Sequence, residues 1–90
     1  DYPGVSPLHC FLKDAKRARY TAATDEEALS AYQLVTKYEN LNPSLEPSHA
    51  FAEAIKIAPK LSKNTIVCVC SCGDAYKDKH ILKERLGKYK

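Results

Sequence analysis

A continuous apolar run near the C-terminal end of the 90-residue chain constrains its fold more than any other feature. The run is Ile66-Val67-Cys68-Val69-Cys70, and apolar and polar side chains do not alternate along it. Such a run is typical of a strand that is buried on both faces, as in a parallel sheet. The turn chemistry of Cys72-Gly73-Asp74 ends it. The sequence therefore predicts a buried strand over residues 65–70.

A second, shorter strand is predicted over residues 19–23. Two strands make a thin sheet, and a strand buried on both faces needs neighbours on both edges. Ninety residues leave room for one core. We therefore expect a single α/β unit over residues 1–90 that lacks part of its own sheet.

Four helices are predicted from local start and stop signals. Their order with the strands, α-β-α-α-β-α, predicts the α/β class: part of an open, mostly parallel sheet flanked by helices. The start signals are N-caps and a capping box, and the stop signals are proline and glycine. Helices are predicted to start at Ser6-Pro7, at Thr24 with Glu27, at Ser48 (after a loop over residues 41–47) and at Lys79. The third is predicted to end before Pro59 and the fourth at Gly87. The stripes expected to face the core are Ala28, Ala31, Tyr32, Val35 and Tyr38, and then Phe51, Ala54, Ile55 and Ala58.

Composition and charge exclude several classes of protein. Apolar residues make up 44% and charged residues 28%, as in a globular chain rather than a disordered or fibrous one. The longest apolar run is too short to span a bilayer, and no leader of a secretory type opens the chain. Residues 76–90 carry six Lys or Arg against Asp78 and Glu84, a charge of +4. The solvated end of a final helix explains this charge better than a nucleic-acid or membrane site, so neither partner is expected.

The cysteines indicate the compartment. Three of the four, Cys68, Cys70 and Cys72, stand at alternate positions of one segment, and the fourth is Cys10. A disulfide framework would distribute its cysteines over loops, so we expect buried, reduced thiols and a cytoplasmic protein. Alternate side chains of a strand lie about 6.6–6.8 Å apart, whereas tetrahedral zinc needs its sulfurs under about 4 Å apart. The segment is therefore expected to bind no metal.

Two places carry candidate chemistry. Glu46 precedes a helix, where it is either a first-turn acid that interacts with the helix dipole or a functional carboxylate on a rigid turn; position alone favours the first. Residues 71–74 follow the predicted strand, where open α/β sheets bind ligands, although the same residues also make ordinary turns. His49 and His80 are expected to be surface or capping residues. No nucleophile elbow, phosphate-binding loop or zinc-protease motif is present.

Several segments together resemble the C-terminal part of tryptophan synthase beta chains, and the resemblance covers nearly the whole chain. The family typically reads L-D-Y-P-G-V-G-P, then A-T-D-E-E-A-L, then A-L-E-S-S-H-A, then N-L-S-G-R-G-D-K-D. The matching segments here are residues 1–5, 23–29, 45–50 and 69–74. The resemblance implies a pyridoxal-phosphate enzyme of fold type II, a carbon–oxygen lyase of tryptophan biosynthesis that joins L-serine to indole. It also implies that this chain is an incomplete portion of that larger fold.

The resemblance also implies site residues and partners. Two acids match positions beside the substrate and the reacting carbons, and three residues match the pyridine-nitrogen side of the cofactor site. Two further positions match backbone carbonyls that help to hold a monovalent cation. The implied partners are the remainder of the beta chain, a second beta chain and the alpha subunit that delivers indole. The residues are Asp1 and Glu46 (catalytic), Ser71, Gly73 and Asp74 (cofactor), and Tyr2 and Gly4 (cation).

The chain departs from the family pattern in its final loop. Residues 71–78 lack the family arginine, and no lysine here stands in the motif of the family's Schiff-base lysine, which lies upstream together with a glycine-rich phosphate cup. The chain also opens with Asp1 rather than Met. We therefore expect the C-terminal segment of such an enzyme, inactive alone, with a stand-alone, non-catalytic α/β domain that binds a partner or ligand as the alternative.

Overall fold

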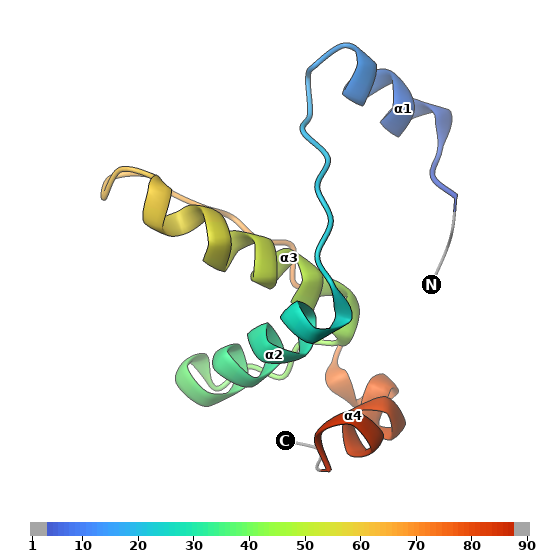
Figure 1. Ribbon diagram of the computed structural model, residues 1–90, viewed down its shortest axis with the longest axis vertical. Coiled ribbons are helices and arrows are strands. Elements are labelled where there is room, and N and C mark those ends of the chain that lie inside the picture. Colours follow the sequence, from blue (N-terminus) through green and yellow to red (C-terminus); the bar gives the residue numbers. More distant parts are fainter. Residues whose placement is uncertain (1–3, 88–90) are drawn as a thin grey trace.

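The computed structural model describes residues 4–87, which form four α-helices and two short 3₁₀ helices (Figure 1). None of the helices in this range is long and apolar enough to cross a membrane. The α-helices are α1 (Pro7–Asp14), α2 (Asp25–Glu39), α3 (Leu45–Ile57) and α4 (Lys79–Leu86), and the 3₁₀ helices are η1 (Ala58–Lys60) and η2 (Ala75–Asp78).

The predicted open parallel sheet is wrong, because residues 4–87 contain no strand. Residues 19–24 and 65–72 have no regular secondary structure, and the described part of the chain holds one isolated antiparallel bridge, between Pro43 and Asp74. A strand persists only where neighbouring strands satisfy its backbone N–H and C=O groups. The apolar run gives a local preference for extended backbone, but no neighbouring strand is present to pair with it.

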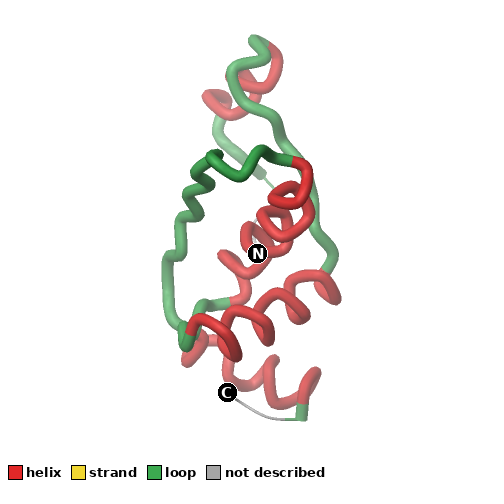
Figure 2. Tube along the Cα trace, turned by 90° about the vertical axis from the view of Figure 1, so that its left-hand side faces the viewer, coloured by secondary structure: helices red, strands yellow, loops and turns green. Residues whose placement is uncertain are grey.

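The predicted burial of the apolar run is also wrong. Ile66 is 86% exposed, and Cys68, Cys70 and Cys72 are exposed, free thiols. In Figure 2 this segment runs as a separate loop from the end of α3 back to α4. Because no element in residues 4–87 covers its outer side, its apolar side chains remain in contact with solvent.

The capping box at the start of α2 is confirmed. The backbone N–H of Glu27 donates to Thr24 Oγ1 over 3.2 Å, and the backbone N–H of Thr24 donates to Glu27 Oε2 over 2.8 Å. The predicted apolar stripe of this helix is buried over its first four members, but Tyr38 is 66% exposed. α2 therefore packs against its neighbours through all but its last turn.

α3 begins at Leu45, three residues before the predicted start, so Pro47 lies inside its first turn. Proline is tolerated there because the N–H groups of a first turn have no partner within the helix. Its buried residues are Pro47, Ser48 and Ala52, and Ile55 of the predicted stripe is 44% exposed. α3 packs against α2, but the predicted stripe would have needed the absent sheet to cover it.

α4 has the predicted bounds and ends at Gly87, whose φ of 70° is a left-handed helix cap. Its Leu82 is fully buried and packs with Tyr32 of α2 and Ala75 of η2, and Leu29, Leu45 and Leu86 surround this cluster. The core therefore joins α2, η2, α4 and the first residue of α3.

α1 is confirmed where its cap and proline predicted it, but none of its residues is buried. Figure 1 shows it apart from the other helices, at the end of an extended connection. Its apolar residues Leu8 and Phe11 are 63% and 64% exposed. The radius of gyration is 14.5 Å, whereas a compact domain of this length has about 12 Å. The helices do not close into one compact body.

Candidate functional site

The loop that precedes α3 is joined to the segment that precedes η2. The Ser44 hydroxyl donates to the Cys72 carbonyl over 3.1 Å, and the Ser44 N–H donates to the Gly73 carbonyl over 3.4 Å. The N–H of Ala75 donates to the Asn42 carbonyl over 3.0 Å. Ser44 is fully buried. This junction places Glu46 and Ser71, which are 25 residues apart, on two segments that are held together.

Gly73 lies at the centre of this junction, in a conformation that suits glycine. Its φ is +82°, in the left-handed region. A Cβ on this residue would lie 2.9 Å from Ser44 Oγ and 3.5 Å from both Cε and Nζ of Lys77. Because Gly73 has no side chain, Ser44 and Lys77 can approach its backbone closely.

Two aspartates fix the ends of helices around the junction. Asp74 Oδ1 accepts from the N–H of Tyr76 over 2.8 Å and so caps η2. Asp78 Oδ2 accepts from the N–H of Leu45 over 2.7 Å, so a residue of η2 caps the start of α3. The sequence indicated Asp74 but missed Asp78, because a cap supplied from 33 residues away leaves no local pattern.

Glu46 makes an ion pair with Lys77. Lys77 Nζ lies 3.1 Å from Glu46 Oε2, and both side chains are about half exposed, at 50% and 53%. The hydrogen bond and the charge of Lys77 lower the pKa of the Glu46 carboxyl below its ordinary 4.5. The same bond raises the pKa of the Lys77 ammonium. Sequence reasoning missed Lys77 for the same reason that it missed Asp78.

A cavity of about 530 Å³ opens beside this pair. Because its walls come from the first turns of α3, from η2 and from α4, they carry both signs of charge among apolar side chains. The lining residues are Leu45, Glu46, His49, Lys77, Asp78 and Ile81.

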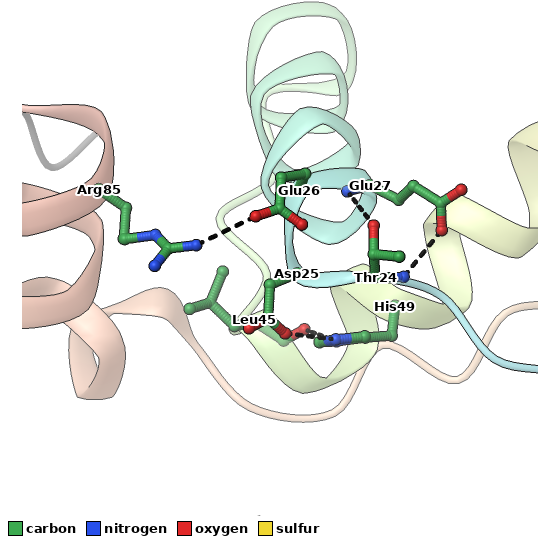
Figure 3. A network of polar contacts seen from close by, with 7 residues as sticks. All are labelled: Thr24, Asp25, Glu26, Glu27, Leu45, His49 and Arg85. Carbon is green, nitrogen blue, oxygen red and sulfur yellow. Dashed lines mark hydrogen bonds and ion pairs between the residues drawn. The ribbon is translucent and has the colours of Figure 1, made fainter.

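His49 is tied into its surroundings and is not an isolated surface group. Its Nδ1 lies 2.8 Å from the Leu45 carbonyl, which only accepts, so this nitrogen carries a proton. Its Nε2 lies 3.5 Å from Asp25 Oδ1 (Figure 3). The same figure shows Arg85 of α4 reaching Glu26 of α2, at 3.4 Å. Polar contacts thus connect the start of α2 to both α3 and α4.

Of the remaining predicted site residues, the structure describes Ser71 and Gly4 but not Asp1 and Tyr2. Ser71 is exposed, and its hydroxyl has no hydrogen-bond partner among residues 4–87. Gly4 is exposed, with no atom within 4 Å of the position of a Cβ. Asp1 and Tyr2 lie outside the described residues.

The cysteines line a second cavity. It has a volume of about 370 Å³ and lies between residues 21–23, α3 and residues 67–70. Cys68 and Cys70 are among its lining residues. No three His, Cys, Asp or Glu side chains within the described range lie close enough together to hold a metal ion.

No model of a known protein family matches the chain. The chain is similar to curated proteins named tryptophan synthase beta chain. It is 52% identical over 86 residues to the protein from Fusobacterium nucleatum. The aligned stretch makes up 96% of this chain and 22% of that relative. For Bordetella petrii the identity is 49% over 87 residues, 97% of this chain and 22% of the relative. For Dinoroseobacter shibae it is 47% over 88 residues, 98% of this chain and 22% of the relative. The chain thus spans about a fifth of the length of these relatives.

Proposed function

This chain is homologous to the C-terminal segment of tryptophan synthase beta chains, and we propose that it acts as that segment of a complete enzyme. The reaction proposed for the complete enzyme is the joining of L-serine to indole with pyridoxal phosphate. The observation that carries the proposal is the junction of Ser44 with Cys72 and Gly73. It holds the Glu46 segment against the segment that follows Ser71, as two parts of one site require.

The uncovered surface supports a role inside a larger assembly. The chain exposes 7155 Å², whereas a compact protein of 10.0 kDa exposes about 5,200 Å². The excess of about 1,900 Å² is more than twice the roughly 800 Å² that one partner contributes to a standard protein–protein interface. It includes the apolar residues of α1 and the run over residues 65–70. The proposed partners are the remainder of the beta chain, which would cover these surfaces, and the second beta chain and alpha subunit of the assembled enzyme.

The residues of the final loop fit one side of the cofactor. Ser71 has an exposed hydroxyl without a partner in residues 4–87, and a neutral hydroxyl can donate to a pyridine nitrogen. Gly73 and Asp74 shape the turn that follows it. Pyridoxal phosphate supplies an electron sink for the substrate's reacting carbons. The Schiff-base lysine and the phosphate cup are assigned to the part of the enzyme outside these 90 residues.

The remaining roles are proposed from the match to the family pattern. Glu46 is assigned to the substrate side of the cofactor, and its position on the wall of the cavity beside α4 supports this role. Asp1 is assigned to closure over the amino-acid substrate. The backbone carbonyls of Tyr2 and Gly4 are assigned to a monovalent cation.

The test is made on the complete beta chain that contains these residues. Ser71→Ala should weaken pyridoxal phosphate binding about two- to tenfold, since one neutral hydrogen bond contributes about 0.5–1.5 kcal/mol. Ser71→Asp should favour the protonated ring and so change the cofactor's absorbance and the reaction specificity. Ser30→Ala, on the exposed side of α2, is the matched control. If both Ser71 variants behave like the unmodified enzyme, Ser71 does not contact the cofactor.

The 90-residue chain alone is expected to form no tryptophan and to attach no pyridoxal phosphate, because it contains no matching lysine motif. Incubation with the cofactor followed by borohydride reduction measures this directly. A reduced adduct at one defined lysine would contradict the proposal and favour an independent catalytic domain.

A further inference from the structure

We propose that Lys77 is a positioning residue for Glu46: its ammonium group holds one oxygen of the carboxylate and so orients it on the wall of the cavity formed by α3, η2 and α4. This inference rests on the proposed function, in which Glu46 serves the reaction.

The other charged groups of this cavity are engaged in holding helices together. Asp78 caps the N–H of Leu45 at 2.7 Å. His49 contacts the Leu45 carbonyl and Asp25. Glu46 and Lys77 are the lining groups that remain, and each has the other as its charged partner.

Lys77 contacts one of the two carboxylate oxygens of Glu46. Lys77 Nζ contacts Oε2, whereas Oε1 has no hydrogen-bond partner among residues 4–87. A carboxylate with one oxygen anchored by a cation has fewer orientations open to it, and the second oxygen can still accept a hydrogen bond. The half-exposed state of both side chains means that a small molecule in the cavity can reach this oxygen.

The position of Lys77 follows from the turn beside Ser71. Its Cε and Nζ lie 3.5 Å from the place where a side chain on Gly73 would begin. Lys77 therefore passes over a residue that has no side chain, and it connects the turn after Ser71 to Glu46. In the proposed enzyme this would couple the cofactor side of the site to the substrate side.

The direct test is the titration of the Glu46 carboxyl group, followed by NMR of its carboxyl carbon in the complete beta chain that contains these residues. The pKa of Glu46 is lowered by Lys77, so Lys77→Met should shift the midpoint upward toward 4.5. Lys77→Arg should restore a low midpoint. Lys79→Met is the matched control, since Lys79 contacts the Tyr76 hydroxyl at 3.3 Å. An unchanged Glu46 midpoint in a folded Lys77→Met chain would overturn the proposal.

A second measurement needs no variant and so does not depend on how Lys77→Met folds. About 1 M salt shortens the screening length to about 3 Å and should raise the Glu46 midpoint in the unmodified chain. A midpoint that is insensitive to salt would also count against the pair.

In the complete enzyme, the acidic limb of the plot of kcat against pH should move to higher pH in Lys77→Met. In Lys77→Arg it should lie close to its position in the unmodified enzyme. An acidic limb that stays in place would overturn the catalytic part of the inference. The Ser71 variants test the proposed function through cofactor binding, whereas the Glu46 titration tests this pair without the reaction. Failure of one therefore does not imply failure of the other.

Discussion

The hydroxyl of Ser44 donates a hydrogen bond to the backbone carbonyl of Cys72, 28 residues further along the chain. Ser44 is fully buried, so the donor is held where water has little access, whereas Cys72 is an exposed residue. This bond closes the loop before α3 onto the turn before η2. It is the contact on which the relative placement of Glu46 and Ser71 depends most directly.

Replacing Ser44 with alanine should therefore destabilise the chain. The substitution removes this part-buried hydrogen bond, which is worth about 0.5–1.5 kcal/mol. Urea unfolding followed by circular dichroism measures the loss. Ser30→Ala, an exposed position in α2, should change the unfolding free energy by less than about 0.5 kcal/mol. Equal effects of the two substitutions would contradict a structural role for the Ser44 bond.

Replacing Gly73 with alanine should destabilise the chain for two reasons. The φ of +82° is unfavourable for any residue with a Cβ, and that Cβ would lie 2.9 Å from Ser44 Oγ. Gly87→Ala separates these effects, because Gly87 has a φ of +70° but no atom within 4 Å. We expect Gly87→Ala to cost about 1–2 kcal/mol through backbone strain and Gly73→Ala to cost more. A smaller loss at Gly73 would show that the junction adapts to the added methyl group.

Thr24→Ala should weaken the start of α2. The substitution removes one of the two reciprocal bonds of the capping box, which is worth about 0.5–2 kcal/mol. Ser6→Ala is the matched control, because Ser6 is the N-cap of α1 but its side chain makes no capping bond. Thermal unfolding should therefore distinguish the two variants. If Ser6→Ala costs as much as Thr24→Ala, the capping bond is not the cause.

Local signals in the sequence predicted the helices. Proline at the first position of α1, the Thr24 capping box and Gly87 all act on the backbone within one turn of where they stand, so the sequence locates them directly. The predicted strand over residues 65–70 needed neighbouring strands to pair with, and residues 4–87 contain none. The cysteines of this segment are exposed for the same reason.

The candidate site could be predicted only in part. Glu46 and Ser71 were identified by the segments in which they stand, and their roles stay predictions. Lys77 and Asp78 act on α3 across 31 and 33 residues. No spacing rule connects such positions, since loop closure rather than local periodicity brings them together.

The ion pair between Glu27 and Lys56 should make the stability of the α2–α3 pair depend on pH. Lys56 Nζ lies 2.7 Å from Glu27 Oε1, and its hydrogen bond, followed by that of the Thr24 N–H, lowers the pKa of Glu27 below its ordinary 4.5. A group whose pKa is lower in the folded state stabilises the fold above its unfolded pKa. That contribution is lost as the pH falls through the folded value. Stability from this group is therefore fully present above 4.5 and declines below it.

Urea midpoints measured from pH about 6 down to pH about 2 would detect this decline. Lys56→Met should lower the midpoint at the upper end of the range, because the charged partner of Glu27 is gone. The midpoints of the variant and the unmodified chain should converge at the acid end, where Glu27 is protonated in both. Lys60→Met, in the exposed 3₁₀ helix η1, should follow the unmodified chain throughout. If the Lys56→Met and unmodified curves remain parallel to the acid end, the pair does not link folding to the titration of Glu27.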